Sequence, residues 1–166
     1  MRPSQPMRIP DMELHFRPAE PADHDDLERM AIESFEPITF FKKVDDRFGP
    51  LNGVNWRERW QNKLRKAFRN ETVLVGTTEG QLVAMAAGTV QEEMRLAFLD
   101  ILAVGQEYQG SGCGRQMLRA FKAHAKQQGA RHIYLDCLVS NENANCLYQT
   151  EGFEEMTRSI YWYAKL

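Results

Sequence analysis

The sequence predicts a mixed α/β protein in which helices flank a sheet and one helix crosses over between two central strands. Residues 72–78 and 81–90 are rich in Val and Thr and meet at a Glu-Gly pair, which is typical of a β-hairpin. Residues 96–104 and 133–139 are mostly apolar, as strands buried on both faces are. A glycine-rich turn and a segment with helical apolar spacing lie between those two runs.

Before the hairpin, the chain predicts one strand and two helices. Alternating apolar and polar residues predict a strand over residues 13–17. Asp23 is placed to cap a first helix that Pro37 ends, and residues 54–69 repeat apolar residues at the spacing of a second helix. Residues 37–55 contain glycine turn pairs and are expected to form a loop.

After the second apolar run, the chain predicts one short helix and a last strand or hairpin. The crossover helix is expected to end at Gly129, and the short helix, with Tyr148 on its apolar face, at Gly152. Residues 153–163 are aromatic and β-branched, which favours a strand. The expected order is strand, two helices, three strands, helix, strand, helix, strand.

The composition limits the classes of protein and of partner. The chain has 166 residues, of which 43% are hydrophobic, so we expect one domain over residues 11–166. Residues 1–10 hold three prolines and predict a disordered tail. The net charge of −2 argues against a nucleic-acid partner bound through bulk electrostatics. No apolar run approaches the roughly 20 residues that span a bilayer, so no membrane partner is expected.

The cysteines predict neither a disulfide framework nor a metal site. Cys113, Cys137 and Cys146 cannot all pair, and they form no Cys-x-x-Cys motif. Reduced thiols in the cytoplasm are the simplest interpretation. No two Cys or His residues stand at zinc-finger spacing, so no metal is expected.

The turn at residues 109–115 suits a phosphate ligand. It reads Gln109-Gly110-Ser111-Gly112-Cys113-Gly114-Arg115 and joins a buried strand to a helix. Glycines let a backbone approach a ligand closely, and the first amides of a helix carry partial positive charge, which favours a pyrophosphate. The spacing fits neither the dinucleotide fingerprint nor the P-loop. The alternative is a tight turn that binds no ligand.

Two motifs resemble the GNAT superfamily of N-acetyltransferases. The first is Gln109-x-x-Gly112-x-Gly114 after a strand that ends Leu102-Ala103-Val104, and it looks like the acetyl-CoA signature of that family. The second is Asn141-x-x-Ala144-x-x-Leu147-Tyr148-x-x-x-Gly152-Phe153, which resembles the family's later motif. Together they cover residues 96–153, and the element order extends the likeness to nearly the whole chain.

The resemblance implies a GNAT-like fold: a central, mostly antiparallel sheet with a parallel, splayed strand pair and flanking helices. It also implies acetyl-CoA as a cosubstrate, with the pyrophosphate wrapped by the backbone amides of residues 109–115. The pantetheine arm would bond to Leu102, Ala103 and Val104 in place of a neighbouring strand, and to Asn141. Acetyl would then pass directly to an amine, without an acyl-enzyme.

Direct transfer requires a neutral amine, a donor to the developing oxyanion and a proton for the leaving thiolate. By the resemblance, Tyr148 lies near the thioester sulfur and supplies that proton, because a phenol and a thiol titrate at about 10 and about 8.5. The alternative is that Tyr148 is a core aromatic residue. A backbone N–H near Val104, freed by the strand splay, is the best candidate for the oxyanion donor.

Two aspartates interrupt the apolar runs and are candidates for the general base. Asp100 is the only ionisable residue among positions 96–104, and by alternation it shares a face with the other even-numbered residues of the run. Desolvation favours the protonated form of a carboxyl, which suits a base that works near neutral pH. Asp136 interrupts residues 133–139 in the same way and is the rival. Either aspartate is otherwise a structural carboxylate.

The sequence therefore predicts an enzyme that moves acetyl from acetyl-CoA to a primary amine, with a small molecule slightly favoured over a protein N-terminus or lysine. The choice of amine is expected to depend on residues 37–55, where Asp45 and Asp46 are candidates to receive a cationic acceptor. The alternative is a GNAT-fold module that binds CoA without turnover. The aromatic residues 161–163 either line a homodimer interface or finish the sheet.

Overall fold

A computed structural model describes residues 12–166, so the predicted tail at residues 1–10 lies outside the described residues. The chain divides into two compact units, Met1–Asp136 and Cys137–Leu166, which we describe separately. The elements of the first unit are β1 (His15–Pro18), η1 (Pro21–Asp23), α1 (His24–Phe35), α2 (Phe40–Phe48), α3 (Trp56–Asn70), β2 (Thr72–Thr78), β3 (Gln81–Gln91), β4 (Leu96–Val104), η2 (Gln106–Tyr108), α4 (Cys113–Gln127) and β5 (His132–Tyr134). The second unit contains α5 (Glu142–Thr150). The expectation of one domain over residues 11–166 stays a prediction.

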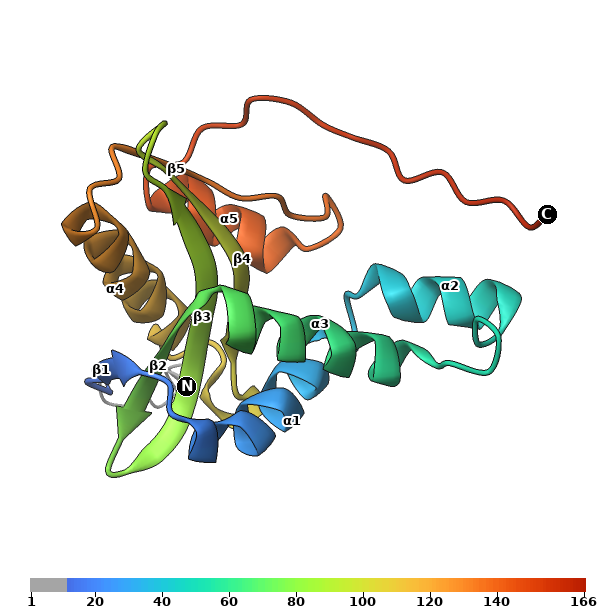
Figure 1. The fold of residues 1–166 in the computed structure, drawn as a ribbon, viewed down its shortest axis with the longest axis horizontal. Coiled ribbons are helices and arrows are strands. Elements are labelled where there is room, and N and C mark those ends of the chain that lie inside the picture. The colour runs from blue at the N-terminus through green and yellow to red at the C-terminus, as the bar shows by residue number, and fades with distance from the viewer. Residues whose placement is uncertain (1–11) are drawn as a thin grey trace, which may run out of the picture. The chain divides into compact units, whose positions relative to one another are not determined.

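The first unit is built on a five-stranded sheet with the order β1-β2-β3-β4-β5. Neighbouring strands are antiparallel except for β4 and β5, which are parallel. The β2–β3 hairpin turns at Glu79 and Gly80, whose φ angles of 47° and 77° have the sign that a two-residue loop requires. The predicted mixed sheet with a parallel strand pair and flanking helices is therefore confirmed (Figure 1).

Helices cover both faces of this sheet. Buried side chains of α1 and α3, such as Leu27 and Leu64, form one core cluster with residues of β2, β3 and β4, including Ala87. The next residue, Gly88, faces the other side, where Phe121 of α4 lies. Figure 1 shows α3 and α4 on opposite sides of β3. The central strands β2, β3 and β4 are therefore buried on both faces, as predicted for residues 96–104, whereas β5 is largely exposed, contrary to the prediction for residues 133–139.

A β-bulge interrupts the pairing of β3 with β4. Ala87 pairs with Ile101 and Gly88 pairs with Leu99, so Asp100 is an extra residue on β4 that has no counterpart on β3. A Cβ at position 88 would overlap the backbone of β4, so glycine is required beside the bulge. The bulge lies in β4, whose bounds the sequence predicted correctly. It shifts the alternation of side chains beyond Asp100 and bends the strand.

The bulge corrects two expectations. Asp100 does not share a face with Leu102 and Val104: it bonds to Lys63 of α3, on the face that buries Ile101, because an extra residue reverses the alternation beyond it. The strand predicted over residues 133–139 is also wrong, since β5 ends at Tyr134 and pairs with β4 only as far as Phe98. A bulged strand bends, which ends the pairing with a straight neighbour.

Three other expectations differ from the structure. Residues 37–55 do not form only a loop, because α2 (Phe40–Phe48) begins after Thr39, whose side chain caps it. Residues 153–163 of the second unit have no regular secondary structure, so the strand or hairpin predicted there is wrong. The carboxylate of Asp23 binds Arg17 at 2.7 Å rather than capping α1. Within residues 12–166, no helix combines the length and the apolar character needed to cross a membrane.

Candidate functional site

The turn at residues 109–115 leads into a helix with a bare N-terminus. Gly112 is the N-cap residue of α4, its φ of 82° lies in the left-handed region, and no side chain caps the helix. Side-chain oxygens of Thr39 and Asn55, by contrast, cap α2 and α3. The first turn of α4 also contains no acidic residue. The amides of Cys113 and Gly114 therefore keep their partial positive charge for a ligand.

The glycines leave room in front of these amides. A Cβ added at Gly110 or at Gly112 would meet no heavy atom within 4 Å, and both residues are exposed. The turn is fixed from behind, because the hydroxyl of Ser111 donates to the carbonyl of Tyr108 and lies 3.2 Å from Sγ of the buried Cys113. The turn therefore presents backbone rather than bulky side chains to an approaching anion.

The last part of β4 has an uncovered edge beside this turn. Gly105, the residue after β4, donates its N–H to β3 at 2.8 Å, and antiparallel bonding alternates, so the N–H groups of Leu102 and Val104 point away from β3. β5 does not cover that edge, because its pairing ends at Phe98. The side-chain amide of Gln109 donates to the Val104 carbonyl at 3.1 Å. This bond ties the turn directly to the uncovered strand.

Asp100, two residues before Leu102, belongs to a charged cluster. Nζ of Lys63 on α3 donates to both oxygens of Asp100, at 2.8 and 3.0 Å. Glu71, the residue that ends α3, faces the same aspartate. Burial raises the pKa of Glu71 to about 7, helped by the charge of Asp100 and a hydrogen bond with it and opposed by Lys63. A carboxyl that titrates near 7 is suited to acid–base chemistry at neutral pH.

Glu71 is the site residue that sequence reasoning missed. In the sequence it is an ordinary acidic residue between a helix and the strand at residues 72–78, with no motif around it. Its special character comes from Asp100 and Lys63, which are 29 and 8 positions away in the chain. Only the packing of α3 against β4 brings these groups together, so a pattern search has no local signal to find.

The rival aspartate lies in a different environment. Asp136 stands two residues beyond β5 and is exposed, because the strand that was expected to bury it ends at Tyr134. The desolvation argument that made Asp136 equivalent to Asp100 is therefore wrong. Asp100, which is 16% exposed and ion-paired, is the better candidate of the two.

In the second unit, the two motif residues Asn141 and Tyr148 belong to α5. Asn141 is the N-cap residue, and its Oδ1 accepts a hydrogen bond from the N–H of Ala144 at 3.4 Å. The amide nitrogen of Asn141 and the second lone pair of its Oδ1 are the groups that this cap leaves for a ligand. The ring of Tyr148 packs edge-on against Phe153, with the ring centroids 5.7 Å apart. The roles expected of Asn141 and Tyr148 stay predictions.

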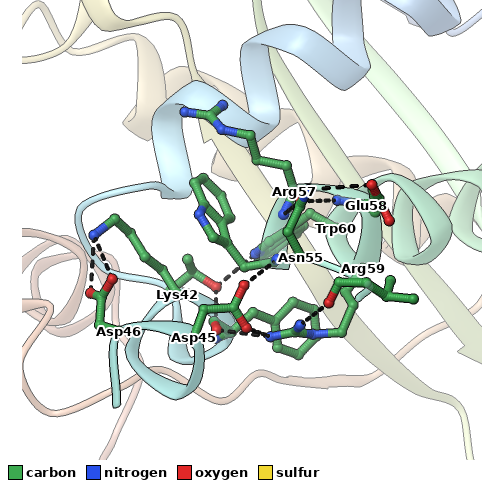
Figure 2. Close-up of polar contacts among 12 residues, drawn as sticks. Lys42, Asp45, Asp46, Asn55, Arg57, Glu58, Arg59 and Trp60 are labelled. Atoms are coloured by element: carbon green, nitrogen blue, oxygen red, sulfur yellow. Dashed lines mark hydrogen bonds and ion pairs between the residues drawn. The ribbon is translucent and has the colours of Figure 1, made fainter. Parts of the chain in front are cut away.

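The helices α2 and α3 share a polar network whose members bond to one another (Figure 2). Asp45 accepts hydrogen bonds from the N–H of Trp56 at 2.6 Å and from Arg59 at 2.7 Å. Arg59 also donates to two backbone carbonyls. Asp46 forms a separate pair with Lys42 and is 62% exposed. Asp45 is thus engaged in helix packing and is a poor receptor for a cationic acceptor, whereas Asp46 is accessible.

A hollow of about 400 Å³ lies in the region expected to choose the acceptor. It is lined by residues from the end of α1, from α2 and from η2, and these carry charges of both signs. The lining residues are Glu36, Pro37, Thr39, Lys42, Lys43, Asp46 and Gln106. Because Gln106 follows the last residue of β4 by two positions, the hollow lies near the C-terminal end of that strand.

The sequence model of the acetyltransferase (GNAT) family matches residues 26–153. The match covers more than half of the chain and includes both motifs and the glycine turn between β4 and α4. The chain therefore belongs to the GNAT family of acetyltransferases, and the resemblance inferred from its motifs is confirmed.

Curated relatives match the chain over part of its length. An aminoglycoside N(6')-acetyltransferase type 1 of Stenotrophomonas maltophilia is 34% identical over 71 residues, which cover 43% of this chain and 46% of that protein. The chloroplastic GCN5-related N-acetyltransferase 7 of Arabidopsis thaliana is 31% identical over 83 residues, which cover 48% and 30%. The chain thus spans less than half the length of these relatives.

Solved structures match over nearly the whole chain. The aminoglycoside N-acetyltransferase AAC(6')-Iy in complex with CoA has a TM-score of 0.66 at 12% identity, covering 93% of this chain and 96% of that one. The ribosomal-protein-S18-alanine N-acetyltransferase of Escherichia coli has a TM-score of 0.65 at 21% identity, covering 87% and 80%. At these identities the likeness shows a shared fold.

Proposed function

We propose that this chain is an acetyl-CoA-dependent N-acetyltransferase that transfers acetyl directly to a primary amine. The observation that carries the proposal is the bare N-terminus of α4, tied to the uncovered edge of β4 by the Gln109–Val104 hydrogen bond of 3.1 Å. CoA combines an anionic diphosphate with an extended arm that contains amides. The helix end suits the diphosphate, and the strand edge suits the arm.

The proposed cofactor-binding residues divide according to the part of CoA that they hold. The backbone of the turn binds the diphosphate, through Gln109, Gly110, Ser111, Gly112, Cys113, Gly114 and Arg115. Leu102 donates its N–H to the pantetheine arm, the N–H of Val104 is kept for the acetyl oxygen of the thioester, and Ala103 between them directs its own N–H toward β3. Asn141 adds its amide nitrogen.

Acetyl-CoA supplies an acetyl thioester, and the chain supplies the proton transfers around it. Asp100 accepts a proton from the ammonium form of the acceptor, and the nitrogen lone pair forms the C–N bond as the C–S bond breaks. The N–H of Val104 donates to the oxygen on which negative charge develops. Tyr148 gives its proton to the leaving sulfur and takes one from the acylated nitrogen. Asp136 is retained as the second candidate base.

For the acceptor we favour a small-molecule amine that enters through the hollow at α2. Lysines and acidic residues line this hollow together, which fits an amine that also carries polar or anionic groups. Aminoglycosides head the test panel, because several relatives and structural neighbours carry that activity in their names. Peptide N-termini and lysine peptides complete it.

Release of the CoA thiol with this panel tests the function. We expect turnover with at least one amine, and acetyl-CoA at 100 times its Kd should stabilise the fold by about 2.7 kcal/mol. Tyr148→Phe should lower kcat about 100-fold and leave the Kd for acetyl-CoA unchanged. Tyr161→Phe, the same change elsewhere in the second unit, is the control.

Two results would redirect the proposal. If the protein binds CoA tightly but cleaves the thioester with none of the amines, the alternative function is favoured: a GNAT-fold module that binds CoA without turnover. An unchanged kcat in Tyr148→Phe contradicts the acid role of that phenol.

A further inference from the structure

The cluster at the β4 bulge contains two carboxyl groups and one ammonium group. Lys63 places its ammonium on Asp100, with bonds of 2.8 and 3.0 Å to the two carboxylate oxygens. Glu71 follows α3 directly, and its own N–H is held by the carbonyl of Ala67 at 2.8 Å, which fixes the backbone beneath its side chain. One cation thus serves a pair of acids.

The other well-buried acids of the first unit are arranged differently. Asp23 and Asp45 are 12% and 9% exposed, and each pairs with an arginine of its own, at 2.7 Å in both cases. Glu28 likewise has Arg65, although at a longer 3.4 Å. The Glu71–Asp100 pair differs from these one-to-one pairs, because the ammonium of Lys63 bonds to Asp100 and no cation bonds to the buried Oε2 of Glu71 among the described residues.

The surroundings of Glu71 favour the protonated form of its carboxyl group. Its Oε2 is buried and receives no hydrogen from any of the residues that the structure describes. The group it faces is Asp100, which is also an acceptor when ionised, and two acceptors repel unless one of them is protonated. The charged groups that act on Glu71 are Asp100 from β4 and Lys63 from α3, and their balance, with burial, leaves the pKa of Glu71 at about 7.

We infer that Glu71 and Asp100 share one proton when Asp100 acts as the general base, so that Glu71 holds the proton that Asp100 takes from the acceptor. This inference rests on the proposed function. Glu71 is a positioning residue, because it acts through Asp100. When both carboxyls are ionised, the pair takes one proton from the ammonium acceptor: an N–H bond breaks, an O–H bond forms, and the nitrogen keeps the electron pair. After product release, the pair returns that proton to water.

The position of the pair fits this role. Asp100 lies two residues before Leu102, which at about 3.3 Å per residue is roughly 7 Å along the strand from the uncovered edge. The bulge turns Asp100 toward α3 and Glu71 instead of leaving it in the strand ladder. The carboxyl of Asp100 is thus close to the strand edge, and the carboxyl of Glu71 lies next to it.

The first test is the pH dependence of kcat/KM in the full chain. Wild type should rise to a plateau with a midpoint near pH 7. Glu71→Gln, which resembles protonated Glu71 in shape, should move that midpoint at least one pH unit lower and leave the KM for acetyl-CoA unchanged. Glu71→Asp should restore the wild-type midpoint, and Glu93→Gln, at an exposed turn position, is the control. A midpoint that does not move in Glu71→Gln overturns the inference.

The second test does not depend on turnover. Carboxyl groups labelled with ¹³C are titrated by NMR in wild type and in Asp100→Asn. The Glu71 carboxyl should titrate near pH 7 in wild type and return toward an ordinary glutamate value when Asp100 is replaced. An ordinary titration of Glu71 in wild type refutes the shared proton even if the enzyme is active. If Glu71 titrates near pH 7 but the protein is inactive with every amine, the shared proton is supported. In that case it is the proposed function that fails.

Discussion

The α2–α3 network and the end of β4 use polar groups in opposite ways. In the network, Asp45 accepts two hydrogen bonds, and Asn55 caps α3 by accepting from two backbone N–H groups, at 2.9 and 3.1 Å (Figure 2). At the end of β4, α4 has no capping side chain, and the strand edge is not covered by β5. The same chain caps α2 and α3 with side-chain oxygens and leaves α4 bare, while α1, which also lacks a side-chain cap, continues directly from η1. Polar groups left in this way indicate where a ligand belongs.

The largest expected effect is a loss of folding stability when the α2–α3 network is broken. Asp45→Ala removes the partner of Arg59, which is 17% exposed, and the acceptor of the Trp56 N–H. Loss of one partner of a buried ion pair should destabilise the fold by about 3 kcal/mol, measured by urea unfolding, with no change in the Kd for CoA. Asp46→Ala, which breaks an exposed pair, should cost less than about 0.5 kcal/mol. Equal costs for the two variants would contradict the claim that the buried Asp45 matters more to stability than the exposed Asp46.

The next prediction compares glycine substitutions at the two ends of α4. Gly112 and Gly129 both have positive φ, 82° and 93°, and both have open space where a Cβ would lie. Replacement by Ala should therefore cost about 1–2 kcal/mol of stability at either position. Only Gly112→Ala should also weaken CoA binding, about tenfold by calorimetry, because its methyl group lies in front of the helix N-terminus. A similar loss of affinity in Gly129→Ala would mean that strain, not access to the amides, explains it.

A smaller loss of stability is expected when the Asn55 cap in the α2–α3 network is removed. Asn55→Ala removes the side-chain cap of α3 and should cost about 1 kcal/mol in thermal or urea unfolding. Affinity for CoA should not change, since this cap binds backbone of its own helix. A loss of CoA affinity in this variant would contradict the division between structural and functional polar groups.

The smallest effect concerns Glu71 and pH. Its pKa is raised from 4.5 to about 7 in the folded protein, so the folded state binds more protons than the unfolded state between these values. The stability contributed by this group therefore falls as pH rises through that window. In Glu71→Gln, the decline of Tm from pH 5 to pH 7.5 should be shallower than in wild type. Parallel Tm curves for the two proteins would argue against a raised pKa.

Local signals predicted much of the fold. The Glu79-Gly80 pair specified the hairpin, because a two-residue loop depends on those residues alone. The apolar run gave the bounds of β4, Leu96–Val104, without error. The helix α2 was missed, because its nine residues lie between Pro37 and Gly49 and those residues indicate a loop. The length of β5 was wrong, because a strand extends only as far as its partner lies beside it.

The sequence predicted the part of the candidate site that is contiguous in the chain. It did not predict the part that depends on contacts between distant residues. The glycine turn is contiguous in the chain, so its spacing was visible. The bulge at Asp100 depends on how β3 and β4 pair, and strict alternation wrongly placed this aspartate on the face of Leu102 and Val104. The character of Glu71 depends on the end of α3 meeting β4. Sequence reasoning therefore found the proposed anion site and half of the acid pair.

The most direct test of the central claim is an amide NMR titration of the wild-type protein with CoA and with pantetheine, which lacks the diphosphate. We predict that the N–H resonances of Gly112, Cys113 and Gly114 shift strongly with CoA and hardly at all with pantetheine, while those of Leu102 and Val104 respond to both. Shifts at the helix N-terminus that are equal for the two ligands, or absent with CoA, would contradict the claim that this bare helix end binds a diphosphate.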